Sequence, residues 1–158
     1  MLPINIDPYK RELLYRKANG NSLRESYKKK LKSFLGIDPE ERHFLSLTET
    51  DNIINKLVKN EEISLENAEF SVLDECLKHF LSKAVGDDYY LLIDGDWRYC
   101  GAYTVRGLIL NMEFEFNKYQ SDEVGLISID LSAEITIDYI ESYNEKPFEF
   151  RVSKYELT

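Results

Sequence analysis

The chain has 158 residues, with 29 Asp/Glu against 20 Lys/Arg and a formal net charge of −9. This length is typical of one domain and is enough to bury a core without a disulfide or a structural metal. The 43% share of hydrophobic residues excludes a disordered chain, and the longest apolar runs are too short for a membrane span. With only two cysteines and no secretory signal pattern, the sequence predicts a soluble protein of the cytoplasm.

The charge is divided unevenly along the chain. Residues 1–35 hold nine Lys/Arg and three Asp/Glu, a net charge of +6, whereas residues 36–158 carry a net charge of −15. An acidic surface of this kind attracts cationic macromolecules and accelerates their association. The charge pattern therefore predicts a binding role and no specific chemistry.

Capping signals predict two helices at the start of the chain. Asp7 before Pro8 suits an N-cap and a first helical position, so a helix is expected over 8–18, stopping at Gly20. A capping box that begins at Ser22 starts a second helix, and Gly36 ends it.

Further helices are expected up to Gly86. A short helical turn follows Asp38, and a helix capped by Thr48 or Thr50 comes next. Ser64 opens the longest predicted helix, which Gly86 ends. The apolar stripe of this helix comprises Leu65, Ala68, Val72, Leu73, Cys76, Leu77, Phe80, Leu81 and Ala84.

Strand signals dominate after Gly86. The run 89–93 is rich in β-prone residues, and Asp94-Gly95 predicts a two-residue hairpin that returns over 97–104. Further strands are predicted over 124–129, 133–140 and 147–152.

Residues 105–118 fit two templates. A strand places Leu108, Leu110, Met112, Phe114 and Phe116 on one face. A helix would leave Leu110 and Phe114 on the side opposite to the other apolar residues. The strand is therefore preferred, and the helix remains the alternative.

The order of these elements predicts the fold class. Helices first and strands later, without strand–helix repetition, indicate an α+β fold in which N-terminal helices pack on a C-terminal, mainly antiparallel sheet. We expect a single domain over 1–158, with a helical part over 1–86 and a β-rich part over 87–158.

The residue types that carry catalysis are sparse. His43 and His79 have no metal-ligand spacing, and neither cysteine has a local activating residue. An Asp pair at Asp94-Gly-Asp96 has two interpretations, a metal site or a turn, and the turn is the simpler. No glycine-rich phosphate loop occurs, so we expect no enzyme, no metal and no cofactor.

A basic cluster offers an alternative partner. Lys28, Lys29, Lys30 and Lys32 lie on one predicted helix beside Tyr27 and could contact RNA. The −15 charge of the remaining chain would repel phosphate, which favours a solvated helix face or contact with the protein's own acidic part.

Acidic and aromatic residues of the β-rich part form the preferred candidate surface. Carboxylates can replace a phosphate backbone in the active site of a basic nuclease, and aromatic residues supply buried anchor area. The predicted partner-binding residues are Asp94, Asp96, Trp97, Tyr99, Asp122, Glu123 and Asp138.

Several segments resemble known proteins. Residues 12–27 and 31–36, followed by Asp96-Trp-Arg-Tyr-Cys-Gly-Ala102, 127–132 and 135–138, are similar to bacterial toxin immunity proteins, including YxiF-like proteins and the immunity partners of contact-dependent inhibition toxins. The resemblance implies a cytoplasmic protein without enzymatic activity that binds the C-terminal nuclease domain of a toxin and blocks it. From the short apolar runs and the acidic charge we expect no membrane and no nucleic-acid partner, and the oligomeric state stays open.

Overall fold

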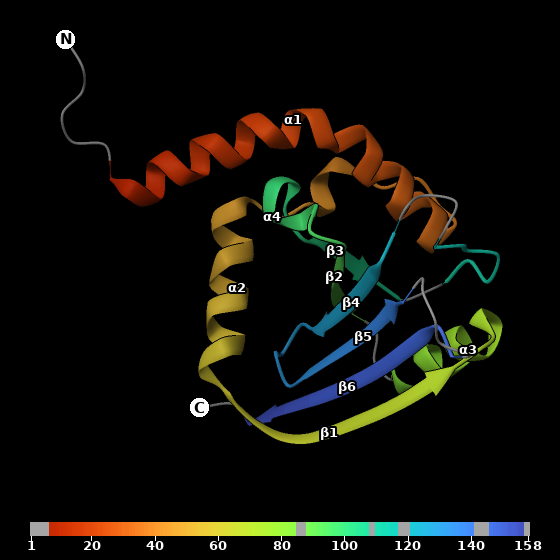
Figure 1. Ribbon diagram of the computed structural model, residues 1–158. Helices are drawn as coiled ribbons and strands as arrows, with labels where there is room; N and C mark the ends of the chain where they lie inside the picture. The colour runs from red at the N-terminus through yellow and green to blue at the C-terminus, as the bar shows by residue number, and fades with distance from the viewer. Residues whose placement is uncertain (1–6, 85–87, 108–109, 117–120, 141–145, 157–158) are drawn as a thin grey trace, which may run out of the picture.

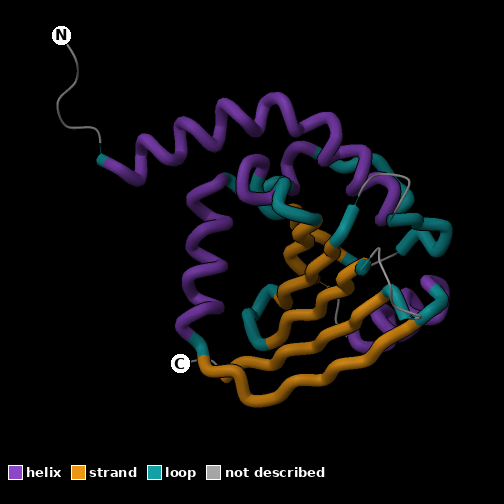
Figure 2. Tube along the Cα trace, viewed as in Figure 1, coloured by secondary structure: helices purple, strands orange, loops and turns teal. Residues whose placement is uncertain are grey.

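A six-stranded antiparallel sheet lies at the centre of the computed structural model, which describes residues 7–84, 88–107, 110–116, 121–140 and 146–156 (Figures 1 and 2). The strand order is β1-β6-β5-β4-β2-β3. The strands are β1 (Glu61–Phe70), β2 (Asp88–Ile93), β3 (Tyr103–Arg106), β4 (Glu123–Ser128), β5 (Ala133–Tyr139) and β6 (Phe148–Glu156). The helices are α1 (Pro8–Leu35), α2 (Leu47–Lys59), α3 (Leu73–Lys83) and α4 (Trp97–Cys100), with a 3-10 turn, η1 (Glu41–His43). The predicted α+β class is confirmed.

Helix α1 is one continuous helix, so the predicted break at Gly20 is wrong. Its ends are as predicted: the Asp7 carboxylate accepts the Tyr9 N–H at 3.1 Å, and Gly36 closes the helix with φ +76°. A Cβ at residue 20 would lie 2.3 Å from the carbonyl oxygen of Tyr99. Gly20 therefore lets α4 approach the middle of α1, and its role is close contact between backbones.

Helix α2 begins slightly earlier than predicted. Ser46 is its N-cap, and its hydroxyl and the Glu49 carboxylate form a complete capping box. Thr48 and Thr50 lie inside the helix, and the Thr50 hydroxyl accepts the Ala102 N–H at 3.0 Å.

The longest predicted helix, from Ser64 onward, is wrong in its first part. Residues 61–70 form strand β1, paired with β6, and α3 begins only at Leu73. Ala68 and Phe70 pack against the main core whereas Asn67 and Glu69 are exposed, a period of two residues. Pairing with a strand some 80 residues away overrides the local helical pattern, and the predicted helical part thus contributes a strand.

Strands β2 and β3 pair as the predicted hairpin required, with Leu91 opposite Tyr103. The connection is longer than predicted, because 97–100 form helix α4 and the returning strand starts only at Tyr103. The two-residue turn and the strand over 97–104 are therefore wrong.

The strand preferred for 105–118 is also wrong over most of its described part. Strand β3 ends at Arg106, and residues 110–116 form no strand. Phe114 lies edge-on to Phe34 at a centroid distance of 5.2 Å, and Phe116 stacks on Tyr139. These aromatic contacts close the end of the core. The remaining residues of the predicted strand, 108–109 and 117–118, lie outside the described residues.

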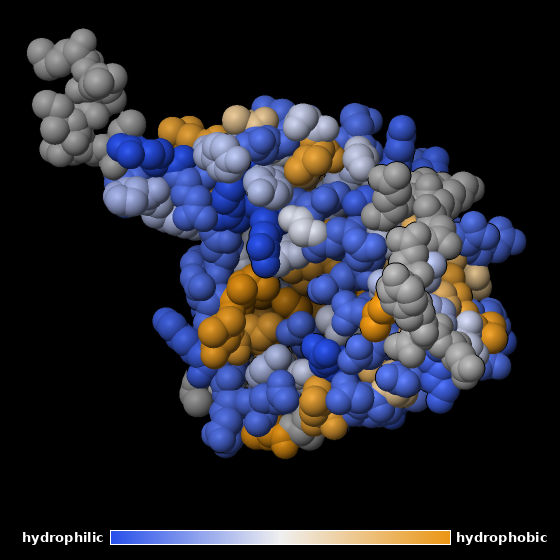
Figure 3. Space-filling view, viewed as in Figure 1, coloured by the Kyte–Doolittle hydropathy of each residue, from blue (hydrophilic) through white to orange (hydrophobic). Residues whose placement is uncertain are grey.

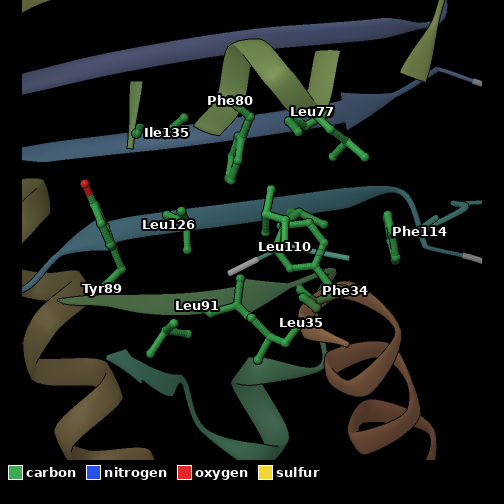
Figure 4. Packing of buried hydrophobic residues seen from close by; sticks show 14 of the residues in the cluster. Phe34, Leu35, Leu77, Phe80, Tyr89, Leu91, Leu110, Phe114, Leu126 and Ile135 are labelled. Atoms are coloured by element: carbon green, nitrogen blue, oxygen red, sulfur yellow. The ribbon is translucent and has the colours of Figure 1, made fainter. Parts of the chain in front are cut away.

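The main core lies on one face of the sheet, and a smaller apolar cluster lies on the other face beside α2. The C-terminal half of α1 and helix α3 pack on the face of the main core, and Figure 4 shows Phe34, Leu77, Phe80 and Leu126 turned toward one another. The last three strands agree with the predictions to within a few residues. None of the helices in the described ranges is long and apolar enough to cross a membrane.

Candidate functional site

Four carboxylates form one row across the open face of the sheet, opposite the core. Residues at alternate positions of β4 point to opposite faces, so Val124 and Leu126 enter the core while Glu123 lies on the open face. Glu123 is the cross-strand partner of Asp138. The row continues through β6 to β1, because Asp138 pairs with Glu149 and Glu149 pairs with Glu69. We call these residues, Glu123, Asp138, Glu149 and Glu69, the acidic row.

The proximity of these carboxylates changes their protonation. Desolvation and the facing charge of Asp138 raise the pKa of Glu123 to about 7, although the residue as a whole stays exposed. Desolvation also raises the pKa of Asp138. Two facing carboxylates repel each other when both are ionised, and a proton retained on Glu123 removes this repulsion. The pair thus holds one proton at pH values where isolated carboxyl groups have lost theirs.

Few described cations compensate the acidic row. The Arg151 guanidinium lies 3.3 Å from the Glu149 carboxylate, and its side chain is half exposed. Beyond Arg151 lies Glu134, whose pKa is raised by burial and whose carboxylate accepts the Tyr155 hydroxyl at 3.4 Å. The open face is therefore rich in negative charge.

An apolar hollow adjoins this acidic area. Figure 3 shows hydrophobic residues gathered in a depression between α2 and the neighbouring strands. The partly buried residues packed against this small apolar cluster are Leu45, Ile53, Ile54, Tyr90, Trp97, Leu131 and Tyr155. They surround a buried base of Leu57, Leu92, Ala102 and Ile127. A surface that joins apolar area to charge suits a protein partner.

Asp94 and Asp96, both predicted to contact a partner, instead bind a cation of their own chain. Lys30 of α1 donates to Asp94 at 2.7 Å and to Asp96 at 3.1 Å. Asp94 also accepts the backbone N–H groups of Asp122 and Glu123 at 2.6 and 3.0 Å. Their side chains are only 13% and 16% exposed, so the pair holds α1 against the start of β4.

The other predicted residues are divided among separate places. Trp97 and Tyr99, on α4, line a cleft of about 600 Å³ with α1 and α2, and Trp97 also packs against the small apolar cluster of the hollow. The Arg98 guanidinium lies 5.3 Å from the Trp97 ring centroid. Asp122 is exposed immediately before β4. Only Glu123 and Asp138 of the predicted set lie together on the open face.

Glu69 and Glu149 are row members that the sequence analysis missed. Glu69 was placed on a helix, and the order of the strands is a non-local property that no local pattern reveals. The signal available in the sequence was the alternation of polar Asn67 and Glu69 with apolar Ala68 and Phe70, which is typical of a strand.

The basic helix is largely neutralised by acids of its own chain. Lys28 and Arg24 pair with Glu41, and Lys32 lies 3.0 Å from Asp38. Lys28, Lys30 and Lys32 thus form ion pairs, and among the described residues only the exposed Lys29 of the lysine cluster forms none. The alternative of RNA binding loses most of its electrostatic basis.

The geometry offers little for covalent or metal chemistry. Burial raises the pKa of the Cys76 thiol to about 12 and also raises that of Cys100, which disfavours a reactive thiolate. The Lys30 ammonium lies where a metal would sit between Asp94 and Asp96. Within the described ranges no three His, Cys, Asp or Glu side chains are grouped to hold a metal ion.

Comparisons of the chain with protein-family models, with curated proteins and with solved structures gave no match.

Proposed function

We propose that this protein is a binding protein that engages a cationic protein through the acidic row and the adjoining apolar hollow. The single observation that supports this most is the register that aligns four carboxylates across four adjacent strands, on the face opposite the main core. Opposite charge steers association, and the apolar hollow provides area whose burial stabilises the complex.

The acidic row is costly for folding, which favours a functional role. Like charges directly opposite one another in a sheet are destabilising, and here three such contacts follow in succession. Local rules of this kind are violated mainly at functional sites. A cationic partner would relieve the repulsion between these carboxylates, and this relief would contribute to the free energy of binding.

The form of this function that we favour is neutralisation of a bacterial toxin in the cytoplasm. The segments similar to immunity proteins support it, and a nuclease domain that binds phosphate presents the cationic surface that the row would fit. The protein would cover the active site or the substrate path of the toxin and would perform no catalysis itself.

The test uses the C-terminal domain of the protein encoded by the neighbouring open reading frame. We expect it to form a complex with this protein that survives size-exclusion chromatography at low salt. A row variant, Glu69→Gln/Glu123→Gln/Asp138→Asn/Glu149→Gln, should bind at least about tenfold more weakly, because charge pairs across an interface contribute more than about 1.4 kcal/mol in total.

The matched control removes four exposed carboxylates elsewhere: Glu25→Gln/Glu75→Gln/Glu113→Gln/Glu115→Gln. It should bind like the wild type. Absence of any complex, or equal weakening by both quadruple variants, would contradict the proposal.

A further inference from the structure

The two edges of the sheet differ in length and in covering. At one edge β3 has four residues, and the chain before α2 covers it through a bridge between Phe44 and Tyr103. At the other edge β1 has ten residues, and its ladder partners in the described part of the chain all lie on β6. Figure 1 shows β1 as the outermost strand.

Beyond a register shift between Glu62 and Ser64, residues 64–70 form a regular edge that no other strand of the described residues covers, so its backbone N–H and C=O groups are available for pairing. Such edges pair readily with an extended segment of another chain. Exposed apolar side chains accompany this edge, since Ile63 is 60% and Leu65 is 49% exposed. Helix α3 supports the strand from behind, where Lys83 and His79 bind Glu66 at 3.0 and 3.2 Å.

The charge of β1 selects the occupant. Its ten residues include Glu61, Glu62, Glu66 and Glu69, and no Lys, Arg or His. Pairing β1 with β1 of a second copy would bring two strands of this charge together, which is unfavourable. A segment with Lys or Arg is complementary, and Glu69 ends the acidic row at this same edge.

We propose that β1 accepts an extended, lysine- or arginine-bearing segment of a partner protein as a seventh strand. This rests on the proposed function and gives its mode of binding. On the open face, the added strand would place one cation beside Glu69 and the methylene chain of another beside Leu65. The main-chain hydrogen bonds supply affinity, and these alternate positions supply selectivity.

The probe is a synthetic ten-residue peptide that alternates Lys and Val, added to the full-length, ¹⁵N-labelled protein. With the peptide at about ten times its dissociation constant, hydrogen exchange should slow about tenfold at alternate amides of 64–70, the part of β1 with regular register. A peptide that alternates Glu and Val should give no protection. Protection located elsewhere, or none, would overturn the proposal.

A charge-swapped variant tests the selectivity. Glu61, Glu62 and Glu69 are exposed, so Glu61→Lys/Glu62→Lys/Glu69→Lys should fold, which its melting curve would verify. It should prefer the Glu–Val peptide over the Lys–Val peptide. If the variant still preferred the Lys–Val peptide, the charge of β1 would not select the partner. A wild-type dimer joined through β1 would also contradict the proposal.

The two proposals fail separately. Suppose that the neighbouring toxin domain binds, but that neither this domain nor the peptide protects the amides of 61–70. Strand addition is then wrong, and the acidic row remains the binding surface. If the peptide adds to β1 and the toxin domain does not bind, strand addition holds and the toxin assignment falls.

Discussion

Carboxylates of this chain have two distinct environments. Asp94 and Asp96 are turned inward and satisfied by Lys30, whereas Glu123 and Asp138 face each other on the open side of the sheet. The sequence places all four in one acidic part and does not distinguish them, because the lysine that neutralises the first pair lies some 65 residues away.

Substitution of Lys30 tests the inward pair. In Lys30→Met, the two aspartates lose their cation in a site where the lysine side chain is 10% exposed. We expect a loss of about 3 kcal/mol in the free energy of unfolding, typical of breaking a buried ion pair. Urea denaturation would measure it. The neighbouring exposed residue provides the control, since Lys29→Met should change stability by less than about 0.5 kcal/mol. Equal effects of the two substitutions would show that the contacts of Lys30 with Asp94 and Asp96 do not stabilise the fold.

The outward pair predicts a dependence of stability on pH. The pKa of Glu123 in the folded protein is about 7, above its ordinary value of 4.5, so the folded state binds the proton more tightly than the unfolded state. Stability therefore falls as pH rises from about 4.5 to about 7.

Removing this carboxylate should reverse the loss. We expect Glu123→Gln to be more stable than the wild type by about 0.5–1 kcal/mol at pH 8, the range for relief of a like-charge pair in a sheet. The difference should disappear near pH 4. Denaturation at pH 4, 6 and 8 would measure it, with the exposed Glu113→Gln as control; parallel pH profiles of wild type and Glu123→Gln would contradict the account.

At the scale of elements, close approach and pairing override local signals. Gly20 resembles a helix terminator and is instead the point where the Tyr99 carbonyl meets α1. Residues 61–70 resemble the start of a helix and are instead an edge strand. The capping of α1 and the strands β4 to β6 depend on local sequence and were predicted well, whereas the N-cap of α2 is Ser46 in place of Thr48 or Thr50.

The contact at Gly20 gives a prediction opposite to helix propensity. Alanine in a helix interior is favoured over glycine by about 1 kcal/mol. Nevertheless Gly20→Ala should destabilise the protein by about 1–3 kcal/mol, the usual effect of overpacking, because its Cβ would meet the Tyr99 carbonyl at 2.3 Å. Thermal melting would measure the change. The adjacent exposed Asn21→Ala should be neutral or stabilising, and a stabilised Gly20→Ala would disprove the close contact.

At the scale of the whole molecule, the segregation of charge has a structural basis in two parts. Acids of the body pair with Lys28, Lys30 and Lys32 of the basic cluster on α1, and four further carboxylates align on the open face. The fold class, the acidic character and two members of the acidic row followed from the sequence. The row as a whole did not, because it depends on the strand order β1-β6-β5-β4, which places residues 69 and 149 side by side.

The most direct measurement of the central claim is the association rate of the neighbouring toxin domain at several ionic strengths. For the wild type we expect a rate that falls steeply with added salt, because the unpaired carboxylates steer the encounter. The row variant should associate at least about tenfold more slowly at low salt and with a shallower salt dependence, while the off-row variant follows the wild type. Identical salt profiles for the wild type and the row variant would contradict a binding function of the acidic row.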